Sequence, residues 1–264
     1  MEYKGFILDK NEGIAILTFN RPERMNALTV EIGNVLLPKL FRDLQDDDAV
    51  RVLIITGTGK GFCAGADIDE LPYMSQLAAK LTRAGRLQAI GAYTLSLYNL
   101  EKPVIAAVNG VAAGAGVSLA LIADIRIASE NARFSMSFVD KGLVPDCGAT
   151  FTLPRLIGLS RAFELMYGGG VVDAQEAERI GLVNRVVPHD KLMEETVALA
   201  KRLAKAPPLA LAQTKRALHY GIMNSLEQQL YFETYAQNFC SETEDAREGI
   251  NSFLEKREPQ FKGR

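Results

Sequence analysis

Apolar residues recur with two different periods along the chain, and the shorter period predicts β-strands. Two apolar runs flank the polar segment 9–13, which ends in glycine, and this arrangement is typical of a β-hairpin. Compact apolar runs further along stop at turn residues, as strands buried on both faces do. The pattern predicts strands at 6–8, 14–19, 51–56, 104–108, 124–128 and 133–136.

Helical periodicity and capping residues predict the elements between these strands. Thr29 is a suitable N-cap for a helix that runs to about residue 45. Pro38 is expected to bend or split this helix, because proline lacks the amide hydrogen that the helix needs. Helical patterns also cover residues 67–71 and 75–100.

From Asp173 onward the pattern is mostly helical. A short polar residue followed three positions later by Glu or Gln marks a helix start. We interpret three such pairs as helix starts: Asp173 with Glu176, Ser225 with Gln228, and Ser241 with Glu244. The sequence thus predicts an α/β core over residues 1–190, in which strand, glycine-rich loop and helix repeat, and a helical region over residues 191–264.

Composition and charge narrow the class of protein. The 264 residues are 48% hydrophobic and 23% charged with a net charge of −2, which suits a globular protein without a basic surface for nucleic acid. Two histidines and three widely spaced cysteines offer neither a metal motif nor a disulfide framework. Residues 103–123 carry no charge, yet the turn signal at 109–110 favours strand, turn and buried helix over a membrane span. We expect a cytoplasmic protein.

Two glycine-rich loops follow predicted strands, GTGKGFCAGAD at 57–67 and NGVAAGAG at 109–116. Neither is a nucleotide motif, because Gly61 follows Lys60 where a P-loop needs Ser or Thr, and Leu119 replaces the last glycine of GxGxxG. Such loops free backbone amides, and two that converge could stabilise a thioester oxygen as it becomes an enolate. The alternative is that the glycines only permit tight turns.

Six segments, in order along nearly the whole chain, resemble the enoyl-CoA hydratase/isomerase (crotonase) family. They are NRPERMNAL at 20–28, GFCAGADI at 61–68, KPVIAAVNG at 102–110, ADIRIA at 123–128, GLVN at 181–184 and EGINSFLEKR at 248–257. The resemblance implies a core of repeated ββα units and a helical C-terminal region that forms a homotrimer or a dimer of trimers. It also implies an acyl-CoA thioester as substrate, with no redox or metal cofactor.

The resemblance also assigns site residues by position. The amides of Ala66 and Ala115 would form an oxyanion hole. Ala115 stands where the family usually has glycine, and it keeps its N–H provided that the backbone there does not need a positive φ. The remaining residues would line the path of CoA and substrate: Arg24, Met25, Ala64, Asp67, Ile68, Gly114, Phe138, Leu143 and, at a CoA phosphate in the same or a neighbouring subunit, Lys256.

Two departures from the family pattern decide the expected chemistry. Hydratases of the family use two glutamates, and Ser118 and Phe138 occupy those positions here. Neither side chain exchanges a proton near neutral pH, so hydration by the two-glutamate route is not expected. Asp146 stands where hydratases tend to have glycine, and the segment 142–150 is most similar to the 1,2-epoxyphenylacetyl-CoA isomerases.

We therefore predict that Asp146 is the catalytic residue of an isomerase. It would move a proton between two carbons of the acyl chain, or assist rearrangement of an epoxide ring, while two amides hold the enolate oxygen. Packing among Leu143, Val144 and Phe138 is expected to raise its pKa. The alternative is that Asp146 only caps the helix that begins near Gly148.

Other side chains near the glycine-rich loops are weaker candidates for catalysis. Cys63 and Cys147 have no neighbouring histidine or lysine and fit as small buried residues. Asp140 is either a second acid or part of a solvated turn with Lys141. Two further functions stay open: a hydratase that uses Asp146 alone, and a non-catalytic acyl-CoA-binding or RNA-binding relative, the RNA role disfavoured by the net charge.

Overall fold

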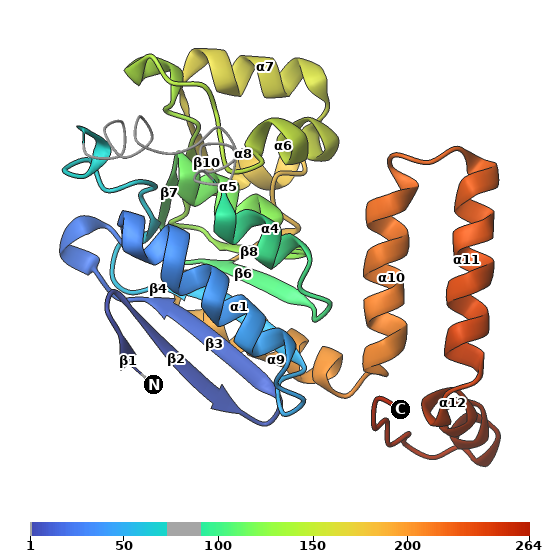
Figure 1. Ribbon diagram of the computed structural model, residues 1–264. Coiled ribbons are helices and arrows are strands. Elements are labelled where there is room, and N and C mark those ends of the chain that lie inside the picture. Colours follow the sequence, from blue (N-terminus) through green and yellow to red (C-terminus); the bar gives the residue numbers. More distant parts are fainter. Residues whose placement is uncertain (1, 73–90) are drawn as a thin grey trace.

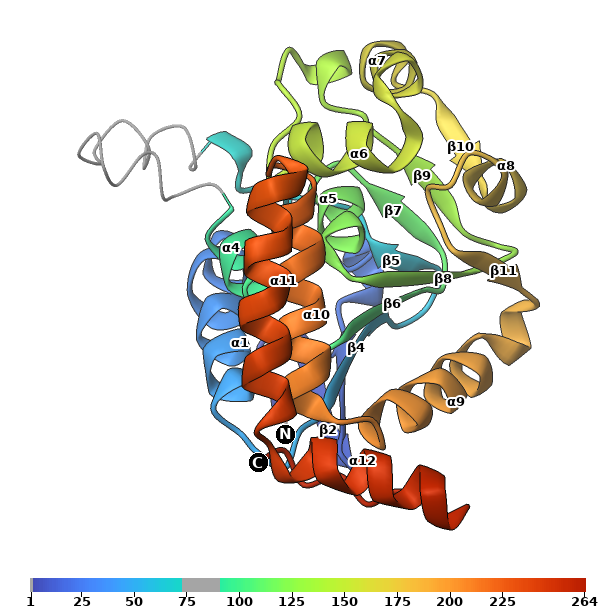
Figure 2. The ribbon, with the colours of Figure 1, turned by 90° about the vertical axis from the view of Figure 1, so that its right-hand side faces the viewer.

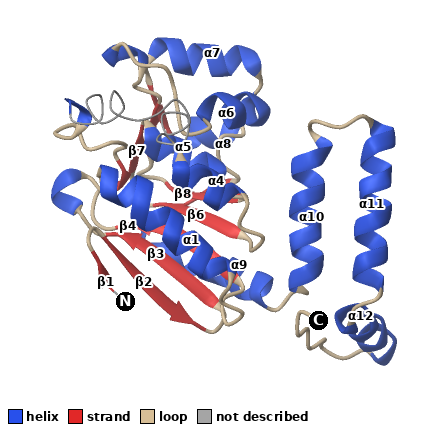
Figure 3. Ribbon diagram, in the orientation of Figure 1, coloured by secondary structure: helices blue, strands red, loops and turns tan. Residues whose placement is uncertain are grey.

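The computed structural model describes residues 2–72 and 91–264, and its strands form two sheets (Figures 1 and 3). The large sheet has the order β1-β2-β3-β4-β6-β8-β11, and the small sheet has the order β10-β9-β7-β5. The strands are β1 Glu2–Tyr3, β2 Phe6–Asn11, β3 Ile14–Phe19, β4 Val52–Gly57, β5 Gly61–Cys63, β6 Val104–Val108, β7 Val111–Ala113, β8 Ile125–Ser129, β9 Arg133–Ser135, β10 Val171–Asp173 and β11 Arg185–Val187.

Helices surround both sheets. The α-helices are α1 Leu37–Gln45, α4 Ala92–Tyr98, α5 Ala115–Ile122, α6 Ala149–Ile157, α7 Leu159–Gly168, α8 Ala174–Arg179, α9 Leu192–Ala204, α10 Pro208–Gly221, α11 Leu226–Ser241 and α12 Glu244–Glu255. Three 3₁₀ turns span Pro22–Arg24, Val139–Lys141 and His189–Lys191, and a π-helix spans Ile32–Leu36.

The predicted repeat of strand, strand and helix is confirmed. Each of β4, β6 and β8 lies in the large sheet, and the strand that follows it, β5, β7 or β9, lies in the small sheet. Strands β5, β7 and β9 pair in parallel, as do β4, β6 and β8. The strand predictions did not include β1, β5, β7, β10 or β11, which have two or three residues each; β5 and β7 also lie inside the glycine-rich loops.

The central strands are apolar throughout because helices cover both faces of the large sheet. Along β4, Leu53 and Ile55 face the main core with α1, α4 and α5, whereas Val52 and Ile54 face α9. Figure 2 shows this sheet between α1 and α9, with α10–α12 beside the core. Among the residues described, no helix has the length and apolarity that crossing a bilayer requires.

Helix α10 is fixed to the core by ionic contacts. The Nζ of Lys215 lies 2.9 Å from Oδ2 of Asp124, which also accepts a hydrogen bond from the amide of Val104 at 2.8 Å. Arg216 forms an ion pair with Glu101, which lies just before β6 in the sequence. The helical hairpin of α10 and α11 therefore has a set position against this chain's own sheet.

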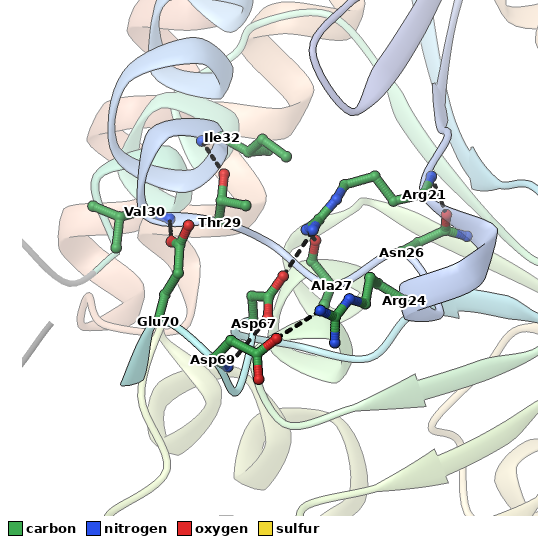
Figure 4. Close-up of polar contacts among 10 residues, drawn as sticks. All are labelled: Arg21, Arg24, Asn26, Ala27, Thr29, Val30, Ile32, Asp67, Asp69 and Glu70. Carbon is green, nitrogen blue, oxygen red and sulfur yellow. Dashed lines mark hydrogen bonds and ion pairs between the residues drawn. The ribbon is translucent and has the colours of Figure 1, made fainter. Parts of the chain in front are cut away.

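Several predicted helix starts are confirmed. The Oγ1 of Thr29 accepts a hydrogen bond from the amide of Ile32 at 3.1 Å (Figure 4). The helix runs without a break to Gln45; a π segment at Ile32–Leu36 precedes Pro38, where a bend or split was expected. Asp173 caps α8, and Ser225 makes a reciprocal capping box with Gln228 at the start of α11.

The predicted start of the last helix at Ser241 is wrong. Ser241 is the final residue of α11, and its hydroxyl donates to the carbonyl of Asn238. Thr243 caps α12 instead, accepting from the amide of Ala246 at 3.0 Å. Of the predicted helix at 75–100, residues 92–98 form α4 and residues 75–90 lie outside the described part of the chain. Residues 68–70 form a turn, and 71–72 are helical.

Glycines allow the backbones of the two predicted loops to touch. A Cβ added at Gly110 would lie 2.0 Å from the carbonyl oxygen of Lys60, and one at Gly116 would lie 1.9 Å from the carbonyl oxygen of Cys63. Real Cβ atoms do not approach oxygen so closely, so these positions admit no side chain without movement of the main chain.

We expect Gly116→Ala to lower the free energy of unfolding by about 3 kcal/mol or more, because the clash is with backbone rather than with a flexible side chain. Urea unfolding measures the difference. Gly168→Ala is the matched control, since it lies at the end of α7 with no atom within 4 Å of the added carbon. Equal unfolding midpoints for the two variants would show that the loops tolerate separation.

Candidate active site

Two buried asparagines fix the turn that joins β4 to β5. The Nδ2 atoms of Asn26 and Asn109 both donate to the carbonyl oxygen of Gly61, at 2.7 and 3.1 Å. The Oδ1 of Asn109 accepts from the amide of Gly57 at 3.1 Å. At this turn, hydrogen bonds from side-chain amides therefore replace the backbone hydrogen-bond ladder of a sheet. They hold the start of the first glycine-rich loop.

The amide of Ala66 points away from the segment that supports it. Leu28 forms a parallel bridge with Ala66, donating to the carbonyl of Gly65 at 2.7 Å and accepting from the amide of Asp67 at 2.8 Å. In such a bridge the central residue's own N–H faces the opposite side. Within the described chain the Ala66 N–H has no backbone acceptor, so it is free to bind a ligand oxygen.

Ion pairs hold the same loop from the side, as Figure 4 shows. Arg21 donates through Nη2 to Oδ2 of Asp67 at 2.8 Å and through Nη1 to the carbonyl of Ala27 at 2.7 Å. This pairing holds the pKa of Asp67 below its usual range, and Asp67 is buried. Arg24 pairs with Asp69 at 2.6 Å on the exposed side of the loop. Asp67 thus braces the loop that carries the Ala66 amide.

The amide of Ala115 begins helix α5 and also has no backbone acceptor among the described residues. The positive φ of +49° at this turn falls on Gly114, whereas Ala115 has no positive φ. Alanine at 115 therefore presents its N–H without backbone strain. A Cβ added at Gly65 would lie 3.1 Å from this nitrogen, so the loop of Ala66 and the start of α5 are in contact.

Ser118 and Phe138, at which the family resemblance expects the glutamates of hydratases, are both buried. The hydroxyl of Ser118 donates to the carbonyl oxygen of Asp146 at 3.0 Å. The ring of Phe138 lies 3.7 Å from the position of a Cβ on Gly114. One position therefore supports the Asp146 loop, and the other fills space beside α5 with an apolar ring.

The carboxyl of Asp146 is partly buried, and its Oδ1 has no hydrogen-bond partner. Burial raises the pKa of Asp146 above its usual value, as predicted. The predicted cause was wrong in part, because Leu143 is 47% exposed and Val144 is 74% exposed. The two hydrophobic residues precede Asp146 on an open segment, whereas Ser118 packs beneath it from α5.

The capping alternative for Asp146 is wrong. Gly148 holds the N-cap position of α6 with a φ of +83°, and no side chain caps this helix. The contribution of Asp146 to the turn is its carbonyl oxygen, which accepts from the amide of Ala149 at 3.0 Å. A carboxylate is therefore not required there for folding of the helix.

The other predicted binding residues lie in two places. Met25 accepts the amide of Ala64 through its carbonyl at 2.9 Å, which joins the 3₁₀ turn to the first glycine-rich loop. Ile68 is 63% exposed beside them. Lys256 follows α12, and α12 lies at the opposite end of the molecule from α5–α7 (Figures 1 and 2). Within one chain Lys256 is thus apart from the loops.

The remaining candidates do not join the site as acids or nucleophiles. The carboxylate of Asp140 is exposed and lies against Gly169 at the end of α7. Burial raises the pKa of the Cys63 thiol to about 12, and that of the Cys147 thiol to about 12. Both thiols are therefore protonated at neutral pH and unsuited to nucleophilic attack.

Sequence reasoning missed two residues of α4, one that contacts the start of α5 and one that contacts the Asp146 loop. The phenol of Tyr93 donates to the carbonyl oxygen of Ala115 at 3.3 Å, and the hydroxyl of Thr94 donates to that of Cys147 at 3.2 Å. Their only signal was the helical pattern at 75–100, which does not say which neighbour the helix meets.

The raised pKa of Asp146 predicts how its removal changes stability. A carboxyl with a raised folded-state pKa makes the folded chain bind a proton more tightly than the unfolded chain, so the free energy of unfolding falls as pH rises between the two pKa values. We expect Asp146→Asn to be at least as stable as the natural chain at pH 7, with the difference shrinking toward about pH 4. Thermal unfolding across this range measures it.

Asp67→Asn is the matched control of opposite sign. Its folded-state pKa is lowered by Arg21, so its carboxylate contributes stability at pH 7 that is lost as pH falls. The variant is expected to be less stable than the natural chain at pH 7. Equal pH dependence in both variants would contradict the environments described for the two carboxylates.

Comparison with known proteins gives consistent matches over the whole chain. The family model for enoyl-CoA hydratase/isomerase matches residues 9–264. A 1,2-epoxyphenylacetyl-CoA isomerase from Escherichia coli K12 is 39% identical, over 98% of this chain and 99% of that protein. A crotonyl-CoA hydratase from Syntrophomonas wolfei is 41% identical, over 99% of each. The crystal structure of an enoyl-CoA hydratase from Bacillus anthracis has a TM-score of 0.90 at 34% identity, over 99% of this chain and 100% of that one.

Relatives of both activities are thus about equally similar to this chain. The two mixed sheets, the repeated ββα units and the C-terminal helices agree with the fold of the solved relative. The chain belongs to the enoyl-CoA hydratase/isomerase family and has its α/β crotonase fold.

Proposed function

We propose that this chain is an acyl-CoA isomerase in which Asp146 is the only proton carrier. The observation that carries the proposal is a half-buried carboxyl with an unpartnered oxygen on a loop that Ser118 ties to α5, the helix that begins with the free Ala115 amide. Ser118 and Phe138 bring no second acid or base to this side. One carboxylate is sufficient for an isomerisation, because the proton removed is the proton returned.

The proposed reaction begins with the thioester carbonyl oxygen bound by the amides of Ala66 and Ala115. Asp146 removes a proton from carbon 2 or carbon 4, and the electron pair moves onto the carbonyl oxygen to form an enolate. The two N–H donors stabilise that charge, and loss of one such donor typically raises a barrier by ~3–4 kcal/mol. The protonated Asp146 then returns the proton to a different carbon, which moves the double bond.

A raised pKa suits Asp146 to both halves of this cycle. A carboxylate of ordinary acidity is a weak base toward a carbon acid, and burial makes it a stronger one. For a substrate with an epoxide ring, the same two amides and the same carboxyl would serve ring opening and rearrangement. The similarity to the 1,2-epoxyphenylacetyl-CoA isomerase supports this substrate class.

The CoA portion would lie along the segment that joins the first 3₁₀ turn to the loop of Ala66. Arg24, Met25, Ala64 and Ile68 present a guanidinium, backbone groups and apolar surface on that side. Lys256 would serve a CoA phosphate from a neighbouring subunit, since its own helix lies apart from the loops.

Hydration of a 2-enoyl-CoA is the second candidate, because the similarity to a crotonyl-CoA hydratase is as high as that to the isomerase. Asp146 would then activate water and later supply the proton at carbon 2. The two reactions differ in whether solvent oxygen enters the product.

We expect Asp146→Asn to lower kcat on a straight-chain 3-enoyl-CoA or an aromatic epoxide CoA ester by about a hundredfold or more, with CoA-ester binding retained. Chromatographic separation of substrate and product isomers over time measures kcat, and calorimetry measures binding. Asp140→Asn is the control, since its exposed carboxylate lies against Gly169. Full activity of Asp146→Asn would refute the role assigned to this residue.

Parallel assays in ¹⁸O-labelled water, one with the substrates above and one with a 2-enoyl-CoA, separate isomerase from hydratase. An isomerase returns a CoA ester of unchanged mass without labelled oxygen, whereas a hydratase adds one labelled water. Tight binding of CoA esters without turnover on either substrate class would instead support a non-catalytic acyl-CoA-binding role.

The helical hairpin supports the expected self-association. Its exposed faces carry large apolar side chains, which contact water in a single chain. They are Leu218, Leu226, Leu230, Tyr231 and Tyr235. We propose that these faces meet other copies of the chain in a trimer or a dimer of trimers.

Light scattering is expected to give the mass of three or six chains. Replacing Leu226 and Leu230 of α11 together by Glu should reduce that mass, because each side chain is more than half exposed in one chain and its charge would be buried on assembly. Leu159→Glu, at an equally exposed position on α7, is the control. A single-chain mass for the natural protein would contradict the proposal.

A further inference from the structure

The turn that follows Asp146 has a backbone conformation that its sequence does not favour. The amide of Ala149 donates to the carbonyl oxygen of Asp146 at 3.0 Å, which closes a four-residue turn over 146–149. The two central residues, Cys147 and Gly148, have φ angles of +51° and +83°, as in a type I′ turn. Asparagine or glycine usually takes the first of these positions, and a cysteine rarely adopts a positive φ. Contacts from outside the turn must therefore hold it in this form.

Two helices pack against this turn. A Cβ added at Gly148 would lie 3.1 Å from Cγ2 of Thr94 on α4 and 3.4 Å from Cδ1 of Ile122 on α5. A Cβ added at Gly91, the N-cap of α4, would lie 3.7 Å from Cα of Cys147. Both central residues of the turn are thus in close contact with a helix, which leaves the turn little room to change its conformation.

Each of these helices also supplies a buried hydroxyl to the turn. The hydroxyl of Thr94 donates to the carbonyl oxygen of Cys147 at 3.2 Å. The hydroxyl of Ser118 donates to the carbonyl oxygen of Asp146 at 3.0 Å. The other acceptor within reach of Ser118 is the carbonyl oxygen of Gly114, at 3.4 Å, so the carbonyl of the turn is the nearer one.

The hydrogen bond of Thr94 departs from what a hydroxyl on a helix usually does. Ser96, two residues further along α4, shows the usual case, because its hydroxyl donates to the carbonyl oxygen of Ala92 in the same helix at 3.1 Å. Thr94 instead donates to a carbonyl oxygen that no backbone amide of the described chain reaches. The carbonyl of Asp146 differs, since the amide of Ala149 also donates to it. We therefore expect Thr94 to contribute more than Ser118 to holding the turn.

We propose that Thr94 and Ser118 are positioning residues for Asp146. Their hydrogen bonds hold the turn 146–149 against α4 and α5 in a conformation that its sequence disfavours. Because α5 begins at Ala115 and carries Ser118 in its first turn, the helix that presents the free amide also fixes the loop of the proposed base. The kinetic consequence rests on the proposed function, whereas the contacts of the turn do not.

We expect Thr94→Val to lower kcat about tenfold with KM changed less than twofold in steady-state kinetics, because valine keeps the shape of threonine but has no donor. Ser118→Ala should lower kcat about threefold, since the amide of Ala149 still donates to the Asp146 carbonyl. Thr94→Ser should keep the natural kcat because it keeps the hydroxyl. Ser96→Ala is the matched control, since its hydroxyl bonds within α4.

Amide hydrogen exchange tests the contacts of the turn without turnover. In folded Thr94→Val, the peptide that holds the Ala149 amide should exchange about fivefold faster than in the natural chain, Thr94→Ser or Ser96→Ala, as mass spectrometry measures it. Faster exchange in a protein that isomerises no CoA ester would support the role of Thr94 in holding the turn and refute the proposed function. Unchanged exchange, or faster exchange with natural kcat, would overturn the positioning role and leave the proposed function standing.

Discussion

Main-chain atoms of two loops approach each other more closely than any side chain permits, and the candidate site depends on this contact. Gly110 and Gly116 lie against the carbonyl oxygens of Lys60 and Cys63. The contact sets the small sheet in register, with β5 beside β7, and brings the loop of Ala66 to the start of α5. The separation of the two free amides is therefore fixed by packing of backbone on backbone, which has few degrees of freedom.

The sequence pattern predicted the elements whose burial is uniform. Strands β4 and β6 are continuous apolar runs because α9 and the main core cover their two faces, and this leaves a strong signal. The short strands β5, β7 and β10 leave none, since their pairing is decided by segments distant in sequence. The start of α12 was misplaced for a related reason: Ser241 fits a local motif, but α11 continues through it and Thr243 is the residue that caps.

The candidate site was less predictable than the fold. Resemblance to a family pointed to Asp146, and the structure then replaced the reason for its burial. Leu143 and Val144 are its neighbours in sequence and are exposed, whereas Thr94 and Ser118 are buried and donate to carbonyl oxygens of its loop that lie 53 and 28 positions further along the chain. Contacts of this range have no periodicity, so only the folded chain identifies them.

The two free amides have a consequence for how the family can diversify. A main-chain N–H is present for every residue except proline, so the group proposed to stabilise negative charge is insensitive to most substitutions at positions 66 and 115. The proposed proton carrier, in contrast, is one side chain on a partly open loop that its helix does not need as a cap. Mutation can therefore exchange or relocate the base while the scaffold keeps its binding chemistry, which separates the evolution of reaction type from that of stability.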